Sequence, residues 1–356
     1  MAVALYLVST RAFSGKNLFA LTLGKDAQQR GLRVKYLRPL GPHPTQADGI
    51  LTDRDVLCMA ESLKLDTPPA DLCPVPLTEE LTQQALSGQP LDALANIRAT
   101  YDRLAADADV VLIGGIGSLF TTGAIYGASS REIADLLGAR ALVIARYEVG
   151  RTPDELLSSC QALGDHVAGA VINGLLPKQR RHIEETLIPY FEGKNIPIFG
   201  ALPDDPVLHA VSVQELIDTL KAKVLTGEEH LGDLVERFSI GAMYEEAALT
   251  YFRKVNNKGV ITGGDRSDIQ RAALETSTRV LVLTGGIQPA NFILSLASER
   301  KVPVLLVSED TLTTVERIEK ILEQMRIFQP RKTDRAMHLV HEHVNLERLW
   351  KTVGVI

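Results

Sequence analysis

Eight residues near the N terminus have the types and the spacing of a phosphate-binding loop. In the form GxxxxGK[ST], glycines let backbone N–H groups approach the phosphates, the lysine reaches the outer phosphates and the hydroxyl holds magnesium. Here the sequence is TRAFSGKN, so Gly15 and Lys16 are intact, whereas Thr10 stands at the first glycine and Asn17 at the hydroxyl. The spacing predicts a phosphate site and a weakened magnesium site. The residues expected around the anion are Ser14, Gly15, Lys16 and Asn17.

The flanking elements must present this loop at the end of a strand. The apolar run Val3 to Val8 predicts a buried strand, and the pattern from Leu18 to Gln29 predicts a helix. Strand, loop and helix in this order are what a phosphate loop needs. The alternative is an ordinary helix N terminus with an exposed lysine, because Gly-Lys pairs are common by chance. The placement between strand and helix favours the phosphate loop.

Length and composition are those of a globular protein with no polyanion partner. A chain of 356 residues suits two domains. A net charge of −6 with scattered basic residues argues against nucleic acid binding. There is no basic leader at the N terminus, no apolar run of membrane-spanning length, and the three cysteines are widely spaced. We therefore expect a cytoplasmic protein with reduced, mostly buried thiols that binds neither nucleic acid nor membrane.

Short β-branched runs alternate with amphipathic helical patterns, which predicts a doubly wound α/β domain with a mostly parallel sheet. The expected strands are Val3 to Val8, Arg33 to Leu37, Val110 to Ile113, Ala141 to Ile144, His166 to Ile172 and Ile196 to Phe199. The polar stretch at 221–233 favours a domain boundary. The predicted domains are 1–222 and a second, smaller α/β domain at 234–356.

In the second domain, three predicted strands each lead into polar residues and then a helical pattern. The strands are Gly259 to Ile261, Val280 to Leu283 and Val302 to Val307. Loops that follow parallel strands gather along one edge of the sheet, where ligands of such folds bind. The residues expected to converge on a small polar ligand are Asp265, Arg266, Thr284, Gly286, Asp310 and Thr311. The alternative is structural, with Asp265, Asp268, Asp310 and Thr311 capping helices and the glycines closing tight turns.

Two parts of the chain carry a specific family resemblance. Residues 259–286, GVITGGDRSDIQRAALETSTRVLVLTGG, resemble the DRTGG domain. The first domain resembles the dethiobiotin synthetase-like domain that precedes DRTGG in long phosphate acetyltransferases. Its further markers are VKYLRPLG at 34–41, VLIGGIGSLF at 111–120, VINGLLP at 171–177 and FGALPDD at 199–205. The resemblance implies the N-terminal region of such an enzyme, without the separate acetyl-transferring domain.

Dethiobiotin synthetases activate a carboxylate with ATP, and the resemblance assigns roles residue by residue. Lys16 matches the phosphate lysine, and Arg38 takes the place of a second lysine near the reacting groups. Asp55 resembles the aspartate that reaches magnesium. The third metal contact in that family is a glutamate at the end of the central strand, where this chain has Gly114 and Gly115.

The resemblance also assigns a role to Asn173, which corresponds to the asparagine that reads the adenine edge. The alternative is a turn-forming pair of Asn173 with Gly174. Adenine reading predicts a nucleotide ligand, whereas a turn carries no such implication.

These departures predict binding without turnover. Magnesium neutralises the charge that develops during phosphoryl transfer, so the loss of its ligands harms catalysis more than binding. The leading hypothesis is a non-catalytic regulatory or sensor protein, homo-oligomeric, that binds ATP, another nucleotide or a small anionic metabolite. One alternative is an active ATP-dependent ligase in which Asp53 or Asp48 replaces the lost ligands. The others are a scaffold partner of a separate phosphate acetyltransferase and a loop collapsed around Thr10 that binds nothing.

Overall fold

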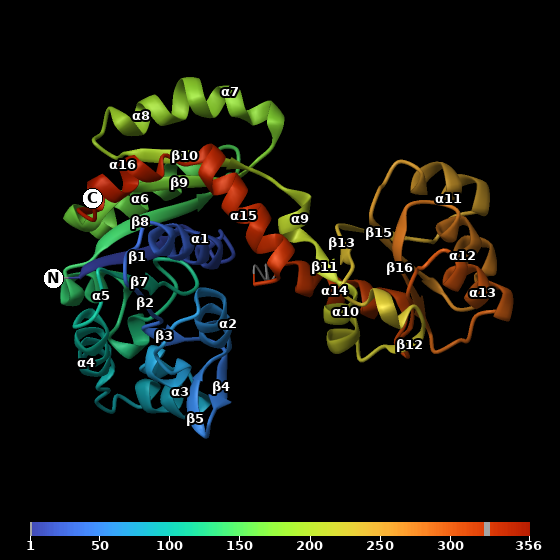
Figure 1. The fold of residues 1–356 in the computed structure, drawn as a ribbon, viewed down its shortest axis with the longest axis horizontal. Coiled ribbons are helices and arrows are strands. Elements are labelled where there is room, and N and C mark those ends of the chain that lie inside the picture. The colour runs from blue at the N-terminus through green and yellow to red at the C-terminus, as the bar shows by residue number, and fades with distance from the viewer. Residues whose placement is uncertain (1, 324–327) are drawn as a thin grey trace. The chain divides into compact units, whose positions relative to one another are not determined.

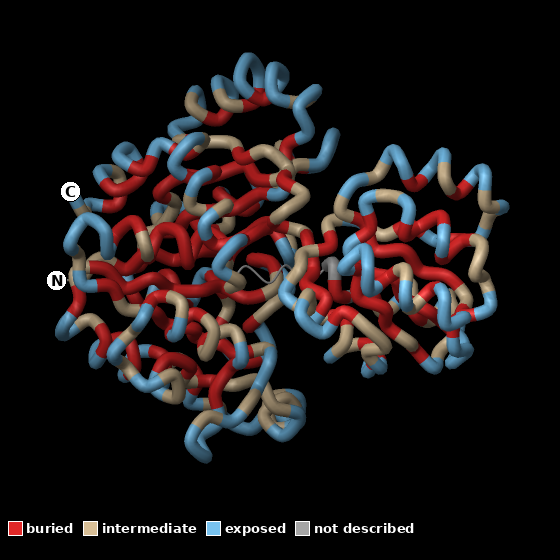
Figure 2. Tube along the Cα trace, turned by 45° about the vertical axis from the view of Figure 1, so that its right-hand side comes forward, coloured by how far each residue is buried: buried red, intermediate tan, exposed pale blue. Residues whose placement is uncertain are grey.

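The computed structural model describes residues 2–323 and 328–356. These residues divide into two compact units, one formed by 2–204 together with 328–356 and the other by 205–323. Buried residues follow the strands in both units, whereas exposed residues lie on the outer helices and loops (Figure 2). Each unit therefore has its own sheet and its own apolar core.

The described part of the first unit is built on a six-stranded sheet in the order β10-β9-β8-β1-β7-β2 (Figure 1). All neighbouring strands in it are parallel. The strands are β1 (Val3–Ser9), β2 (Val34–Leu37), β7 (Val110–Gly114), β8 (Arg140–Arg146), β9 (Val167–Leu175) and β10 (Ile198–Pro203). The prediction of a doubly wound, mostly parallel sheet is confirmed, because each of the six predicted apolar runs forms a strand.

Helices cover both faces of this sheet, as a right-handed βαβ chain requires. One face carries α1 (Lys16–Gln29), α15 (Pro330–His343) and α16 (Leu346–Val353), and the other carries α4 (Ala93–Ala105), α5 (Ser130–Leu137) and α6 (Thr152–Leu163). The further helices of the unit are α2 (Arg54–Leu63), α3 (Glu79–Leu86), α7 (Arg180–His182) and α8 (Ile188–Glu192). Four short strands form two small sheets beside α2, namely β3 (Leu40–Gly41), β4 (Pro44–Ala47), β5 (Ile50–Asp53) and β6 (Val75–Pro76).

The C-terminal helices divide the chain differently from the domains 1–222 and 234–356 expected from the sequence. Helix α15 contacts α1 and β10 (Figure 1). The fully buried Trp350 of α16 donates from its indole Nε1 to Asp26 of α1 at 2.6 Å. An amphipathic helix must bury its apolar face against some partner. In this chain the partner is the sheet of the first unit, so residues 328–356 pack there and the second unit begins at residue 205.

Within residues 205–323, the second unit has a five-stranded sheet in the order β12-β17-β16-β15-β14. The strands are β12 (Lys223–Thr226), β14 (Arg237–Ile240), β15 (Lys258–Gly263), β16 (Thr278–Thr284) and β17 (Val304–Leu306). Only β12 pairs antiparallel among these described neighbours. A short pair, β11 (Val211–Ser212) and β13 (Leu234–Val235), accompanies this sheet. The predicted second, smaller α/β domain is confirmed.

The helices of the second unit lie between these strands along the chain. They are α9 (Pro206–His209), α10 (Val213–Leu220), α11 (Glu245–Phe252), α12 (Ser267–Leu274), α13 (Asn291–Glu299) and α14 (Thr311–Glu323). None of the helices described in either unit is both long enough and apolar enough to cross a membrane.

Candidate functional site

The loop between β1 and α1 has the geometry of a phosphate loop at Gly15. This residue has a φ of 106°, in the left-handed region that favours glycine, and a Cβ at this position would lie 2.6 Å from Asn173 Nδ2. Thr10 is absent from the described residues with positive φ, whereas Phe13 has a φ of 56°. Thr10, at the first glycine position, therefore does not strain the backbone. The non-glycine residue with a left-handed conformation in this loop is Phe13.

Lys16 is buried at the start of α1, with 9% of its surface exposed. Its Nζ donates to Ser9 Oγ at 2.7 Å and to the carbonyl oxygen of Gly117 at 2.6 Å. Burial and the nearby charge of Arg38 lower the pKa of Lys16 to about 7. The lysine thus contacts two neutral oxygens with two of its three N–H donors.

The segment 115–122 after β7 covers this lysine. Its Gly115 N–H donates to the carbonyl of Leu7 at 2.9 Å, and its Leu119 N–H donates to the carbonyl of Ser9 at 2.9 Å. Gly117, whose carbonyl accepts from Lys16, has a φ of 51°. The segment therefore follows the end of β1 and contacts Lys16 through the Gly117 carbonyl.

The Asp55 carboxylate, expected to reach magnesium, is engaged by two side chains. Asn17 Nδ2 donates to Asp55 Oδ2 at 3.0 Å, and Arg38 Nη2 lies 3.3 Å from the same oxygen. Arg38 Nη1 donates to Asn17 Oδ1 at 3.3 Å. Asn17 and Asp55, the two residues expected near the metal, are therefore hydrogen-bonded to each other, and both contact the Arg38 guanidinium.

Arg38 is among the buried charged residues, with 4% of its surface exposed. Burial lowers its pKa, but the neighbouring Tyr36, Asp55 and Asp53 together raise the pKa above the ordinary arginine value. The guanidinium therefore stays charged. Arginine also differs from the lysine of the resembled family, because its planar fork binds two acceptors at once and cannot act as a small tunable amine.

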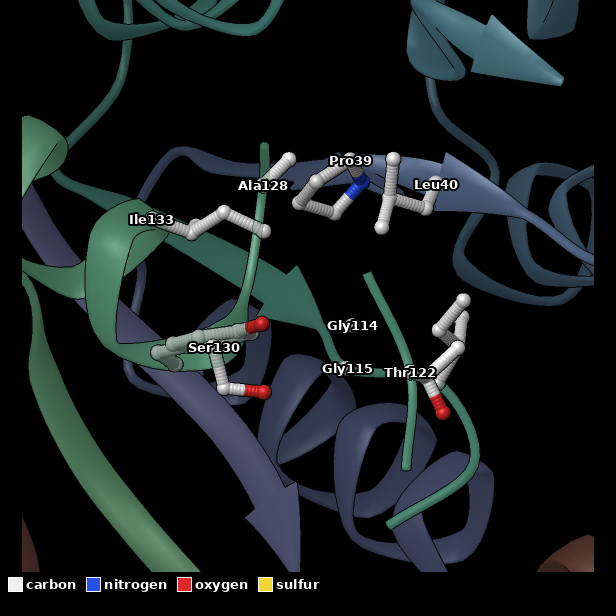
Figure 3. A pocket seen from close by; sticks show the side chains of 10 residues that line it. Pro39, Leu40, Gly114, Gly115, Thr122, Ala128, Ser130 and Ile133 are labelled. Carbon is white, nitrogen blue, oxygen red and sulfur yellow. The ribbon is translucent and has the colours of Figure 1, made fainter. Parts of the chain in front are cut away.

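At the end of β7, where the resembled family has a glutamate, the Tyr36 side chain fills the space beside Gly114. A Cβ on Gly114 would lie 2.2 Å from Tyr36 Oη, and a Cβ on Gly115 would lie 2.6 Å from the carbonyl oxygen of Leu7. Both glycines line a cavity of about 10 Å³, enough for about one water molecule, together with Thr122 and other neighbours (Figure 3). The space of an acidic side chain is thus filled by the Tyr36 ring.

The residues present do not fit a magnesium ion. Magnesium requires near-octahedral oxygen ligands, usually with one or two carboxylates. Asp53, a possible replacement, caps α2 by accepting from Asp55 N–H at 2.9 Å and also accepts from His43 N–H at 2.8 Å. Asp48 lies exposed in the hairpin turn between β4 and β5. No group of three or more acidic, histidine or cysteine side chains in the described residues is arranged to hold a metal.

Asn173 fixes the phosphate loop from β9. Its Nδ2 donates to the carbonyl oxygen of Ser14 at 3.0 Å, and its side chain is buried. Gly174 follows with a φ of 80°, as a turn-forming pair would have, although both residues lie within β9. The Asn173 amide, to which the resemblance assigned adenine reading, therefore donates to the backbone of the loop. Because this amide lies next to Gly15, a side chain at position 15 would collide with it.

A pocket of about 400 Å³ lies beside the loop. Its lining consists of Thr10, Arg11, Ala12, Ser118, Phe120, Thr121, Arg151 and Glu155. Arg11 binds Glu155 through Nε at 2.6 Å and also pairs with Glu148. These ion pairs join the phosphate loop to the segment after β8, so the charges around the pocket compensate one another.

In the second unit the loops after β15, β16 and β17 meet at one edge of the sheet, as predicted. Thr284 Oγ1 lies 2.8 Å from Thr311 Oγ1, and Gly285 N–H donates to the carbonyl of Glu309 at 2.7 Å. Gly286 has a φ of 66° and closes a turn. Asp310 caps α14 by accepting from Thr313 N–H at 3.0 Å, which is the structural alternative for that residue.

Arg266 does not pair with Asp265, the acid beside it in the motif. Its guanidinium binds the Asp268 carboxylate at 3.0 Å and the carbonyl oxygen of Met243 at 2.9 Å. Asp265 is exposed. The motif therefore places one exposed acid and one engaged arginine at this edge.

Sequence reasoning did not identify Tyr36, Ser9 or Gly117 as parts of the site. A signal for Tyr36 was available, because residues two apart on an extended chain share a face and Tyr36 precedes Arg38 by two. Gly117 and Lys16 are 101 positions apart in the sequence, so no local sequence pattern predicts their contact.

Comparisons with known proteins agree with this architecture. The family described as AAA domain matches residues 3–212, and the DRTGG domain family matches residues 215–321. A phosphate acetyltransferase from Synechocystis sp. is 26% identical over 364 residues, covering 98% of this chain and 51% of that protein. One from Nitratidesulfovibrio vulgaris is 26% identical over 370 residues, with coverage of 98% and 51%. The chain thus spans about half the length of the curated relatives it matches.

A solved structure with similarity to this chain contains the CBS and DRTGG domains of the regulatory region of Clostridium perfringens pyrophosphatase, complexed with its activator diadenosine tetraphosphate. It is 23% identical with a TM-score of 0.30, and the match covers 40% of this chain and 70% of that one. The predicted resemblance to the N-terminal region of phosphate acetyltransferases is confirmed by the sequence matches.

Proposed function

The chain belongs to the AAA domain family and carries a DRTGG domain after it, and from this premise we propose a non-catalytic regulatory or sensor protein that binds a nucleotide or a small anionic metabolite. One observation carries the proposal. The Asp55 carboxylate is engaged by Asn17 and Arg38, while Lys16 and the N-terminal amides of α1 remain at the phosphate position. Without a metal to neutralise developing charge, phosphoryl transfer loses its main source of stabilisation. This combination supports binding without turnover.

The relatives support a regulatory role. The chain is related to the N-terminal half of phosphate acetyltransferases, and the match covers nearly all of it. We infer that binding at the phosphate loop is the signal such a region senses. The DRTGG unit is the second part of the proposed sensor, with Asp265, Arg266, Thr284 and Gly286 at its ligand edge.

The test is equilibrium binding of ATP, ADP and AMP to the purified full chain, measured by calorimetry beside an assay for nucleotide hydrolysis. We expect binding with no steady turnover, and loss of binding in Lys16→Ala. Lys178→Ala is the matched control, because Lys178 is exposed and lies outside the site. A parallel titration of Arg266→Ala distinguishes the two units, since loss of binding only in that variant would move the sensor to the DRTGG domain.

Turnover would overturn the proposal. Steady ATP consumption with a carboxylate acceptor, abolished by Lys16→Ala, would instead identify an active ligase of the dethiobiotin synthetase kind. Absence of binding for all three nucleotides, combined with co-purification of a phosphate acetyltransferase, would leave the scaffold interpretation.

We also propose that the sensor is a homo-oligomer. Three large apolar side chains are exposed on loops that follow β1, β7 and β8: Phe13 is 52% exposed, Phe120 57% and Val149 70%. Apolar side chains gathered on loops at the same sheet edge support contact with another protein surface. Light scattering coupled to size-exclusion chromatography measures the oligomer, and Phe120→Ser should shift it toward the monomer.

A further inference from the structure

A buried guanidinium lies among the residues that would hold a metal ion. Arg38 Nη2 is 3.3 Å from Asp55 Oδ2, Nη1 is 3.3 Å from Asn17 Oδ1, and Nη1 is 3.5 Å from Tyr36 Oη. Its Nε is buried and has no hydrogen-bond partner among the described residues. The terminal nitrogens of the Arg38 guanidinium thus contact three side chains, whereas its Nε has no partner among the described residues.

A metal ion cannot enter without dismantling this arrangement. The oxygen of the Asn17 amide faces Arg38 and its nitrogen faces Asp55, so both expected ligands are already bonded. A metal would have to expel a cation from Asp55, and a cation left unpaired in a buried site is strongly unfavourable. The Tyr36 ring also occupies the space beside Gly114 where another carboxylate would be needed.

The geometry points to Arg38 as a permanent substitute for the metal, so that the phosphate loop takes its ligand as a free phosphate-bearing anion without magnesium. This inference rests on the proposed function and specifies its ligand class. Guanidinium groups bind phosphate oxygens through paired, charge-assisted hydrogen bonds, which supplies charge and orientation that a metal would otherwise supply. The buried Nε, which has no partner among the described residues, is the donor that this inference assigns to such a bond.

The experiment titrates the full chain with ATP and with AMP, in excess magnesium and in excess EDTA. We expect ATP to bind at least as tightly in EDTA as in magnesium, because magnesium and Arg38 compete for the same phosphate oxygens. Arg38→Gln should weaken ATP binding at least about tenfold, since it removes a charge-assisted hydrogen bond. Arg33→Gln is the control, because Arg33 is an exposed arginine whose partners are Asp107 and Asp109.

Direct metal binding gives a second measurement. Manganese, detected by electron paramagnetic resonance, should not bind to the wild-type chain with ATP present. The double variant Arg38→Gln with Asn17→Thr removes the guanidinium and restores the hydroxyl ligand, and it should bind manganese with ATP. A thermal melt of each variant checks that it is folded. If Arg38→Gln is not folded, Arg38→Lys takes its place in the experiment.

The outcomes separate this inference from the proposed function. ATP binding that requires magnesium, or that is unchanged in Arg38→Gln, would overturn the inference while leaving a nucleotide-binding regulator. Manganese bound to the wild-type site would overturn it as well. Failure of both ATP and AMP to bind in either buffer would overturn the proposed function itself.

Discussion

Each unit of the protein contains a buried lysine with a lowered pKa, and the two lysines are held differently. Lys16 begins α1 and donates to Ser9 Oγ and to the carbonyl of Gly117, with its pKa lowered to about 7. Lys258 begins β15 and donates to the carbonyls of Val255 and Ser277 and to Thr276 Oγ1, with its pKa lowered by burial to about 8. The three donors of Lys258 are matched by three fixed acceptors.

The difference between them is position on the sheet. Lys258 lies at the amino end of its strand, away from the edge where loops of parallel sheets bind ligands. Lys16 lies at the carboxyl edge, next to a loop of suitable geometry, and contacts the segment that follows β7. A lowered lysine pKa therefore does not by itself mark a functional site, because burial lowers it in both places. The position of the lysine on the sheet makes the distinction.

The largest expected effect is that of restoring an acid in the first unit. Gly114→Glu should lower the free energy of unfolding of that unit by about 3 kcal/mol or more, because its Cβ would overlap Tyr36 Oη in a closely packed core. Urea denaturation followed by tryptophan fluorescence measures it, since the single tryptophan, Trp350, lies in the first unit. A stable Gly114→Glu variant that binds magnesium would show that the site tolerates a metal after all.

Removal of the partner of Arg38 should come next. Asp55→Asn should destabilise the first unit by about 2 kcal/mol, which is less than for a fully buried pair because the Asp55 side chain is 20% exposed. The matching change in the second unit, Asp268→Asn, breaks a pair whose side chains are 37% and 41% exposed and should cost less than about 1 kcal/mol. Tryptophan fluorescence reports the first variant and circular dichroism the second. Equal losses of unfolding free energy in Asp55→Asn and Asp268→Asn would contradict the view that burial makes the first ion pair contribute more to stability than the second.

The two lysines themselves give the direct comparison. Lys258→Met should destabilise the second unit by about 1 to 2 kcal/mol, because it leaves buried acceptors unpaired. Lys16→Met should destabilise the first unit less while abolishing nucleotide binding, because it leaves two acceptors rather than three and removes a cation that burial disfavours more strongly. Circular dichroism and fluorescence follow the two units in the same denaturation. A large loss of stability in Lys16→Met would make that lysine structural and equate it with Lys258.

The last expected effect is a dependence on pH. The folded pKa of Lys16 is about 7 against an ordinary value of 10.5, so above about pH 7 the unfolded chain binds more protons than the folded one. Stability of the first unit should therefore rise with pH, by at most about 1.4 kcal/mol per unit, from about pH 7 to about pH 10.5. Lys16→Met should remove this rise. An equal slope in wild type and variant would assign it to other groups.

The fold was largely predictable from the sequence, whereas the site was predictable only in part. The apolar runs at 3–8, 110–113 and 141–144 all form strands, because a buried parallel strand has a local signature. The expected convergence of loops in the second unit also follows from strand order alone. Asp55 and Arg38 were recognised as residues of interest, yet their pairing with each other was not, because a side-chain contact across two elements leaves no periodic pattern.

The sequence by itself determined the order of strand, phosphate loop and helix, the intact Gly15 and Lys16, and the absence of an acid at 114 and 115. These are properties of neighbouring residues, and short-range sterics and periodicity fix them. Only the tertiary structure decided that Arg38 pairs with Asp55, that Tyr36 fills the space beside Gly114 and that 328–356 pack with the first unit. Such outcomes depend on which distant surfaces bury one another, and that competition is settled by the whole packed chain.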